Sequence, residues 1–180
     1  MIRIVNIVAT TSFETDLDLE TLEKVLSQLG DVIYDPERFP GLVLRTDKGI
    51  SILIFRTGKA VIAGAKSFEE IKDIIKELVK TLKSAGISLP SIRYVYIQNI
   101  VATGDLGTNV NLEMLSRRLR NAFYEPEQFP GLICRLGLGK PVMLVFSTGK
   151  VVIVGSKNVN EIQESFEELK KIVTSIETAA

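Results

Sequence analysis

Apolar residues recur on both sides of the predicted strands, which is the main feature of the pattern along this chain. Two short apolar runs, 51–56 and 59–64, flank a Thr-Gly-Lys turn and predict a β-hairpin. In the first run Leu53 points to one side of the hairpin, and Ile52 and Ile54 point to the other. An antiparallel sheet with one side in water alternates apolar with polar residues. Both sides of this hairpin are therefore expected to contact something other than water.

The rest of the first half predicts three more strands and two helices. Strands are expected at 2–10, 32–34 and 42–46, and helices at 17–30 and 67–86. Gly30 is expected to stop the first helix. Ser67 and Glu70 form a capping box at the start of the second helix, and the apolar residues of that helix make one stripe.

The second half of the chain repeats the first, with edits, at a spacing of about 90 residues. Matching blocks are 97–103 with 4–10, Tyr124–Arg135 with Tyr34–Arg45, and 144–157 with 53–66. Asn158 and Glu161 replace the capping pair of the first half. Two copies are too few for a solenoid, so the pattern indicates a tandem duplication with repeats at 1–91 and 92–180, joined near residues 86–91.

Helices with one apolar stripe cover only one side of a sheet, yet the strands are apolar on both sides. The second side is therefore buried by the other half or by a homodimer, or it is a binding face. The strand blocks of the two halves resemble each other more closely than the helix blocks do. This difference suggests a task that the strands of both halves share.

Composition excludes several classes of function. The chain has 46% hydrophobic residues, one cysteine and no histidine, so imidazole chemistry and an internal disulfide are excluded. No signal peptide and no long apolar run is found, which argues against secretion and membrane spanning. The two Thr-Gly-Lys turns lack the upstream glycine and following Ser/Thr of a phosphate loop. We therefore expect no enzyme, no cofactor and no metal.

Charge is balanced in total but sorted by element. The 22 basic and 22 acidic residues cancel, and the acidic residues collect on the helices and their approaches. Six basic residues instead edge the apolar strand face and favour a long anionic partner: Arg45, Lys59, Lys66, Arg135, Lys150 and Lys157.

Four phenylalanines occupy matching positions in the two halves: Phe39, Phe55, Phe129 and Phe146. A phenylalanine on a strand usually belongs to the core. Phe39 and Phe129 each precede a Pro-Gly turn, where burial is harder. The alternative is that these aromatic side chains are wedges that enter a stack of bases.

The paired motifs NIVAT, Y-x-PE-x-FPGL-xx-R and F-x-TGK-xV-xxG-xK resemble the conserved core of the TATA-binding protein family, over essentially the whole chain. The short ends resemble its archaeal form. The resemblance implies an α+β fold in which two pseudo-symmetric repeats form a saddle, a curved ten-stranded antiparallel sheet with four helices on its convex face. It also implies a general transcription initiation factor that binds the DNA minor groove at A·T-rich TATA elements and kinks the DNA.

The resemblance further implies roles for individual residues. Phe39, Phe55, Phe129 and Phe146 would intercalate between base pairs. Residues toward the minor groove would be Asn6, Val8, Leu53, Val61, Ala63, Asn99, Val101, Leu144, Val152 and Val154. The six basic residues at the edge would contact phosphates. Ala63 and Val154 stand where eukaryotic members carry threonine, so van der Waals contact is expected there.

The partners implied are double-stranded DNA, transcription factor B and the RNA polymerase pre-initiation complex, with a location in the cytoplasm at the nucleoid of an archaeon. Glu125, Glu127 and Gln128 match the loop on which transcription factor B docks. A homodimer is expected to be possible when DNA is absent. The main alternative function is a duplicated protein–protein interaction module that uses the apolar sheet face.

Overall fold

The chain forms two compact units, which a computed structural model describes for residues 1–90, 92 and 94–179. One unit is Asn6–Gln98, and the other combines Met1–Val5 with Asn99–Ala180. The expected boundary between the repeats falls beside Ser91, which lies outside the described residues. The division at residues 91 and 92 therefore stays a prediction.

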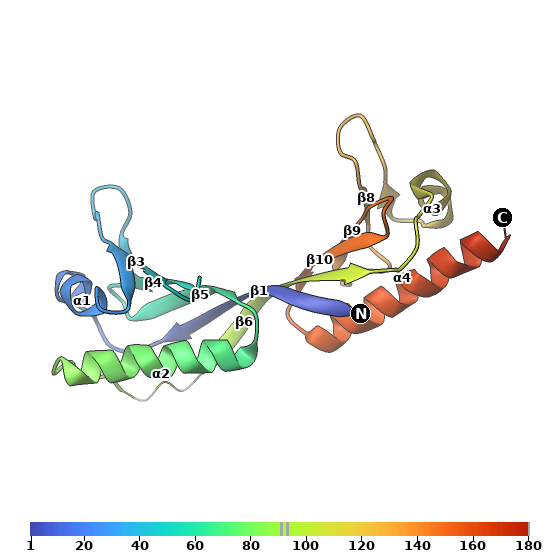
Figure 1. Ribbon diagram of the computed structural model, residues 1–180. Coiled ribbons are helices and arrows are strands. Elements are labelled where there is room, and N and C mark those ends of the chain that lie inside the picture. The colour runs from blue at the N-terminus through green and yellow to red at the C-terminus, as the bar shows by residue number, and fades with distance from the viewer. Residues whose placement is uncertain (91, 93, 180) are drawn as a thin grey trace. The chain divides into compact units, whose positions relative to one another are not determined.

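The described residues of the Asn6–Gln98 unit form two helices and five antiparallel strands in the order β2-β3-β4-β5-β1, and the first four residues of β1 belong to the other unit (Figure 1). The strands are β1 (Ile2–Ser12), β2 (Gly30–Ile33), β3 (Gly41–Thr46), β4 (Ser51–Phe55) and β5 (Lys59–Ala65). The helices are α1 (Leu19–Leu26) and α2 (Phe68–Ser84).

The other unit repeats this arrangement in the order β6-β10-β9-β8-β7. Its strands are β6 (Val95–Asp105), β7 (Ala122–Phe123), β8 (Leu132–Cys134), β9 (Val142–Val145) and β10 (Lys150–Ser156). Its helices are α3 (Leu112–Arg118) and α4 (Val159–Ala179). The expected α+β class is confirmed, with ten antiparallel strands and four helices among the described residues.

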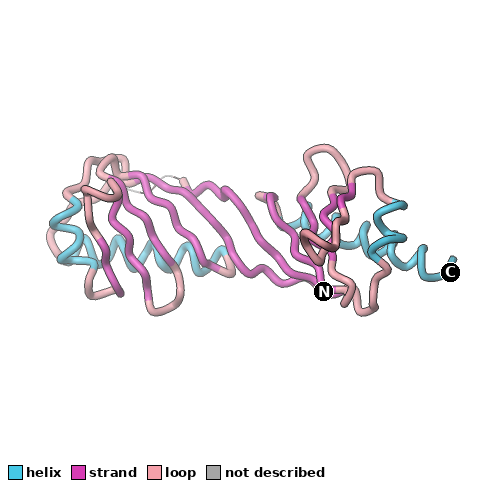
Figure 2. The backbone as a smooth tube through the Cα atoms, turned by 90° about the horizontal axis from the view of Figure 1, so that it is seen from above, coloured by secondary structure: helices cyan, strands magenta, loops and turns pink. Residues whose placement is uncertain are grey.

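One side of the inner strands of each unit is buried because the helices of the same unit pack on it. In β4, Ile52 and Ile54 have no solvent exposure, and the stripe of α2 that includes Ile74 and Leu78 is buried as well. Figure 2 shows the strands in front of the long helix of each unit, so the helices lie on one side. The single apolar stripe predicted for α2 is therefore confirmed, and it defines the core.

The start of α2 forms the predicted capping box. Ser67 Oγ accepts a hydrogen bond from Glu70 N at 3.1 Å, and the Glu70 carboxylate accepts from Lys66 N at 2.7 Å. The matching helix α4 begins with different bonds. Asn158 Oδ1 accepts from Asn160 N at 2.8 Å, and the Glu161 carboxylate accepts from Ser156 Oγ at 2.5 Å. Both helices begin where the sequence predicts, but only α2 has the predicted hydrogen bonds.

The predicted end of the first helix is wrong. Helix α1 ends at Leu26, with Ser27 as its C-cap, and Gly30 is already the first residue of β2. Gly30 pairs with Thr46 of β3, and a Cβ atom at this position would collide with the carbonyl of Arg45. Glycine is therefore required by a close approach of two strands and not by the helix terminus.

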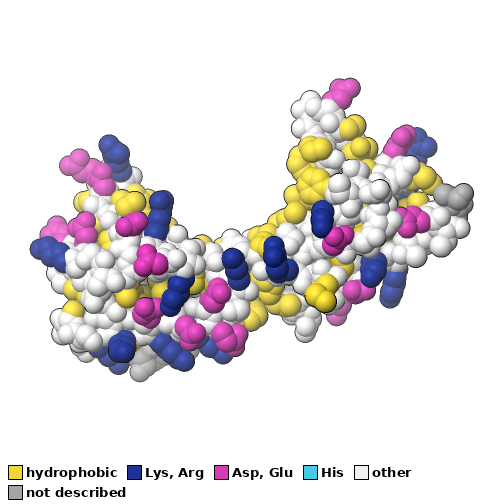
Figure 3. Space-filling model, viewed as in Figure 1, with side chains coloured by type: hydrophobic (Ala, Val, Ile, Leu, Met, Phe, Trp, Pro, Cys, Tyr) yellow, Lys and Arg dark blue, Asp and Glu magenta, His cyan; other side chains and the backbone are white. Residues whose placement is uncertain are grey.

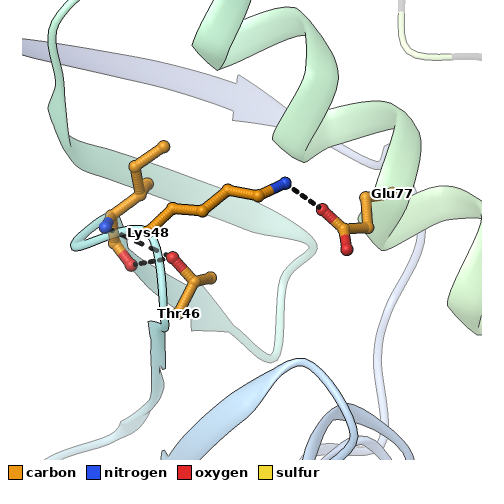
Figure 4. Close-up of polar contacts among 4 residues, drawn as sticks. Thr46, Lys48 and Glu77 are labelled. Atoms are coloured by element: carbon orange, nitrogen blue, oxygen red, sulfur yellow. Dashed lines mark hydrogen bonds and ion pairs between the residues drawn. The ribbon is translucent and has the colours of Figure 1, made fainter.

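The turn between β3 and β4 is tied to α2. Thr46 Oγ1 donates to the Ile50 carbonyl at 3.0 Å and accepts from Ile50 N at 3.2 Å (Figure 4). Lys48 Nζ lies 3.2 Å from Glu77 Oε2 on the helix. Lys48 therefore faces the helical layer, away from the basic residues that edge the strands.

Candidate functional site

The side of the Asn6–Gln98 sheet that the helices leave open is apolar and half-exposed. Its predicted members Val8, Leu53, Val61 and Ala63 all keep intermediate exposure, whereas the neighbours of the first three along each strand are buried. The strand register brings these residues together, since Leu53 pairs with Val61 and Ser51 pairs with Ala63. None of the described residues of this unit covers the face, which favours a binding surface over a second core layer.

The other unit has a matching face. Val101, Leu144, Val152 and Val154 keep intermediate exposure, and Leu144 pairs with Val152 across β9 and β10. Figure 3 shows hydrophobic side chains reaching the surface of each unit over its strands. We call these two surfaces the open faces. They comprise the eight apolar residues just named together with Asn6, Asn99, Phe39, Phe55, Phe129 and Phe146.

The open faces extend to the outer strands, which sequence reasoning missed. Ile33 on β2 is 51% exposed, Phe123 on β7 is 54% exposed, and Ile133 on β8 is 36% exposed. Ile33 pairs with Val43, and Phe123 pairs with Ile133. The alternation along each strand was the available signal, because each of these residues shares the parity of the open face.

The side-chain oxygens of Asn6 and Asn99 each accept a hydrogen bond from a backbone N–H on the neighbouring strand, where the pairing register of the two strands shifts. Asn6 Oδ1 accepts from Gly64 N at 2.7 Å, and Asn99 Oδ1 accepts from Gly155 N at 3.0 Å. An N–H donor requires the oxygen end of the amide, so the orientation of both amides is fixed. No hydrogen bond joins either amide nitrogen to a described residue. Each open face therefore carries one oriented N–H donor group.

The phenylalanines form two pairs with the same geometry. The ring centroids of Phe39 and Phe55 are 5.9 Å apart at 65°, and those of Phe129 and Phe146 have the same distance and angle. Phe39 is 39% exposed, and the other three rings are half-buried. The interpretation of these residues as ordinary core is therefore wrong, because each pair lies at the surface.

A glycine lets each pair form. A Cβ atom on Gly41 would lie 2.8 Å from the Phe39 ring and 3.1 Å from the Phe55 ring. A Cβ atom on Gly131 would meet its own pair of rings at the same two distances. The glycine of the repeated Phe-Pro-Gly sequence is thus explained by the space that the two rings need.

The six predicted basic residues are all exposed. The strand register places Arg45 at the parity of Val43, Lys59 at that of Val61 and Lys150 at that of Val152, on the open side. Five of the six make no ion pair with any residue in the described ranges: Arg45, Lys59, Lys66, Arg135 and Lys157. Lys150 is different, because its Nζ lies 2.5 Å from Asp105 Oδ2.

The Lys150–Asp105 pair was not predicted. The hydrogen bond from Lys150, followed by one from Gly107 N, lowers the pKa of the Asp105 carboxyl below its usual range. The signal was hidden, because the register that places Asp105 opposite Lys150 joins β6 to β10, which are far apart in sequence.

Glu125, Glu127 and Gln128 lie together in the loop between β7 and β8, and all three are exposed. Gln128 N and Phe129 N both donate to the Glu125 carbonyl at 3.0 Å, which closes a tight turn. The matching loop between β2 and β3 closes in the same way on Asp35. Figure 1 shows both loops projecting from the strands of their own units.

No cluster of three or more metal-ligating side chains occurs among the described residues. None of the helices in the described part of the chain is long and apolar enough to cross a membrane.

These features define a class: a duplicated α+β protein whose two repeats each present an open apolar sheet face with one amide donor, one phenylalanine pair and basic edges. The family model described as "Transcription factor TFIID (or TATA-binding protein, TBP)" matches residues 1–85 and 94–176. The chain belongs to the TATA-binding protein family.

Relatives and a solved structure agree with this assignment. The TATA-box-binding protein of Pyrobaculum islandicum is 46% identical over 93% of this chain and 83% of its own length. That of Aeropyrum pernix is 41% identical over 99% of this chain and 85% of its own. The solved structure "Methanococcus jannaschii TBP" matches with a TM-score of 0.85 at 41% identity, covering 97% of this chain and 98% of the other.

Proposed function

We propose that this protein is a general transcription factor that binds the minor groove of A·T-rich TATA elements with its open faces. The observation that carries the proposal is the half-exposed apolar sheet side with one phenylalanine pair in each unit. The family membership and the names of the relatives support the same target. The roles of individual residues, and the division into repeats at 1–91 and 92–180, belong to this proposal.

The amide donors suit A·T base pairs. The minor groove offers only acceptors at A·T pairs, whereas a G·C pair adds a protruding amino donor. The oriented amide groups of Asn6 and Asn99 would donate to those acceptors. Val8, Leu53, Val61, Ala63 and their counterparts in the second unit would pack on the groove floor and leave no acceptor for the amino group of guanine. Selectivity then comes largely from exclusion.

The phenylalanine pairs would act as wedges. Apolar side chains that enter the minor groove unstack a base step and kink the duplex, at a cost of a few kcal/mol per step. Proteins of this family are a standard example of that mode of binding. Steps such as TA unstack easily, so deformability adds to the preference for TATA sequences. Phe39, Phe55, Phe129 and Phe146 are already at the surface and need no rearrangement of the core to reach a base step.

The basic residues would contact phosphates at the edges of the groove. Phosphate contacts position a protein on DNA without reading its sequence. Arg45, Lys59, Lys66, Arg135 and Lys157 have no competing ion pair among the described residues. Lys150 would also reach a phosphate, although Asp105 competes for it.

Partner binding follows from the same proposal. Glu125, Glu127 and Gln128 on their projecting loop would contact transcription factor B, which recruits RNA polymerase to the promoter. The protein would then act at the nucleoid in the cytoplasm of an archaeon and would have no catalytic role.

A titration of one TATA duplex and one duplex with G·C substitutions tests the DNA proposal. Each unfavourable base pair is expected to cost about 1–3 kcal/mol. Two G·C substitutions should therefore cost at least about 2 kcal/mol and weaken binding by at least about thirtyfold. Equal affinity for both duplexes would show that the open faces do not read the minor groove.

A second candidate function rests on the same half-exposed faces. Half-exposed apolar faces also suit a protein partner or a second copy of the chain. Mobility on a sizing column, measured without DNA and then with a TATA duplex, separates the candidates. A dimer that dissociates as DNA binds is consistent with both uses of the face, whereas a dimer that DNA cannot dissociate supports the interaction module.

A further inference from the structure

The two repeats place a lysine at the same point of their open faces. Lys59 and Lys150 each begin a strand after a Thr-Gly turn. The two turns have the same backbone, with φ of +83° at Gly58 and +84° at Gly149. Each glycine N–H donates to the carbonyl of the preceding phenylalanine at 2.9 Å. The backbones of Lys59 and Lys150 therefore occupy equivalent positions in the two units.

The residue opposite each lysine differs. Lys59 pairs in register with Ser12 of β1, and Lys150 pairs with Asp105 of β6. Lys150 Nζ donates to Asp105 Oδ2 at 2.5 Å. Ser12 Oγ instead accepts from a backbone N–H at 3.1 Å, and none of the carboxylates in the described ranges lies within ion-pair distance of Lys59. The charge of Lys59 is therefore available to a partner, whereas the charge of Lys150 is partly neutralised by Asp105.

The Asp105 carboxylate is fixed but exposed. It accepts a second hydrogen bond from Gly107 N at 2.9 Å, so its position does not depend on Lys150 alone. The lysine and aspartate side chains are 65% and 48% exposed. Exposed ion pairs are weak and screened by salt, so DNA can break this one. Breaking it would leave a negative charge beside a phosphate, which lowers the net attraction at this point.

We propose that Asp105 makes the second repeat the weaker of the two halves toward the phosphate backbone and thereby sets the orientation of the protein on a nearly symmetric element. The inference rests on the proposed DNA binding. A duplicated protein with equal halves binds a palindrome in two equivalent orientations. Unequal attraction of Lys59 and Lys150 for phosphate makes the orientations differ wherever the two halves of the element differ in charge or groove shape.

The salt dependence of TATA binding tests the inequality. Each phosphate contact contributes about 0.9 to the slope of log affinity against log salt concentration. Lys59→Met should make the slope shallower by about that amount, Lys150→Met should change it much less, and Asp105→Asn should steepen it. Asparagine keeps the acceptor for Gly107 N, so the turn is preserved. Glu113→Gln removes an exposed carboxylate that pairs with Arg117 on α3, and it serves as the control with an unchanged slope.

Orientation is measured on a palindromic A·T element whose phosphates are replaced by methylphosphonates in one half. A donor dye on Lys171→Cys, exposed on α4, reports its distance from an acceptor at either DNA end. With the wild-type chain, the orientation that places the first repeat on the charged half should be about two- to fivefold more populated than the reverse orientation. Asp105→Asn should bring the two populations closer together.

Two results distinguish failure of this inference from failure of the proposed function. If the duplex binds but Asp105→Asn leaves both the slope and the orientation ratio unchanged, the role of Asp105 is wrong and DNA binding stands. If the wild-type chain does not prefer the TATA duplex to its G·C control, the proposed function itself is wrong.

Discussion

At the scale of single residues, each phenylalanine pair depends on one glycine. Gly41 does not have a positive φ, so alanine is compatible with its backbone, but the added methyl group would press on both rings. We expect Gly41→Ala to keep the fold and to displace Phe39, the more exposed ring. Aromatic pairs contribute about 0.5–1.5 kcal/mol, and if this energy is lost from the bound state TATA affinity should fall by about two- to twelvefold.

Gly137→Ala is the matched control for Gly41→Ala. Gly137 also lacks a positive φ, and its nearest neighbour would be Lys140 Cγ at an ordinary 3.5 Å. This variant should bind a TATA duplex as the wild-type chain does. A gel shift on both variants decides the matter, and equal affinity for the two would show that the pair geometry is irrelevant to binding.

At the scale of elements, the start of α2 depends on its capping box. Ser67→Ala removes the acceptor for Glu70 N and should lower the free energy of unfolding by about 1 kcal/mol. Ser84→Ala, on the exposed last residue of the same helix, should change it by less than about 0.5 kcal/mol. Thermal unfolding followed by circular dichroism compares the two variants. A Ser67→Ala midpoint equal to that of Ser84→Ala would mean that the hydrogen bond contributes nothing.

Cys134 on β8 reports on the core of the second unit. Burial raises the pKa of its thiol from 9.0 to about 12. The unfolded chain therefore loses this proton near pH 9.0 while the folded chain keeps it, so unfolding releases a proton. The stability contributed by this thiol is present below pH 9.0 and is lost as the pH rises toward about 12. Denaturant unfolding at pH 8 and pH 10 should show a smaller loss in Cys134→Ala, and identical losses would contradict the burial of the thiol.

The sequence predicts elements well where pattern and turn residues agree. The hairpin strands predicted at 51–56 and 59–64 differ from β4 and β5 by one residue each, because alternation and the Thr-Gly-Lys turn fix them together. The end of α1 was predicted wrongly because a glycine can either stop a helix or allow a close contact between strands. Only the pairing of Gly30 with Thr46 shows that the second role applies here. A helix stop cannot be told from a close strand contact without the tertiary partner.

The open faces were predictable and the Asp105 contact was not, for the same physical reason. Apolar residues at both parities are visible along one strand, so an uncovered side follows from local sequence alone. The contact between Asp105 and Lys150 depends on the register of two strands 45 positions apart. The distribution of charge along the sequence predicts basic strands here, and it gives no sign that Asp105 partly neutralises the charge of Lys150.

At the scale of the whole molecule, zero net charge and DNA binding are compatible because the charges are separated. Five of the six basic side chains that edge the open faces have no ion pair among the described residues, while many acidic side chains lie on the helices, Glu77 of α2 among them. Much of the binding energy is then expected from apolar contact with a deformed groove, with a smaller share from phosphates. The central claim is therefore that the open faces bend the DNA that they bind, and that contact with the bent duplex provides much of the affinity.

The end-to-end distance of a doubly labelled TATA duplex tests this claim most directly. The wild-type chain should shorten the distance, and Phe55→Ala and Phe146→Ala should each shorten it less while keeping the wild-type circular dichroism spectrum. Phe68→Ala, on the exposed first turn of α2, is the control and should bend the duplex fully. If both Phe55→Ala and Phe146→Ala bend the duplex as much as the wild-type chain does, the phenylalanine pairs are not wedges and the account is contradicted.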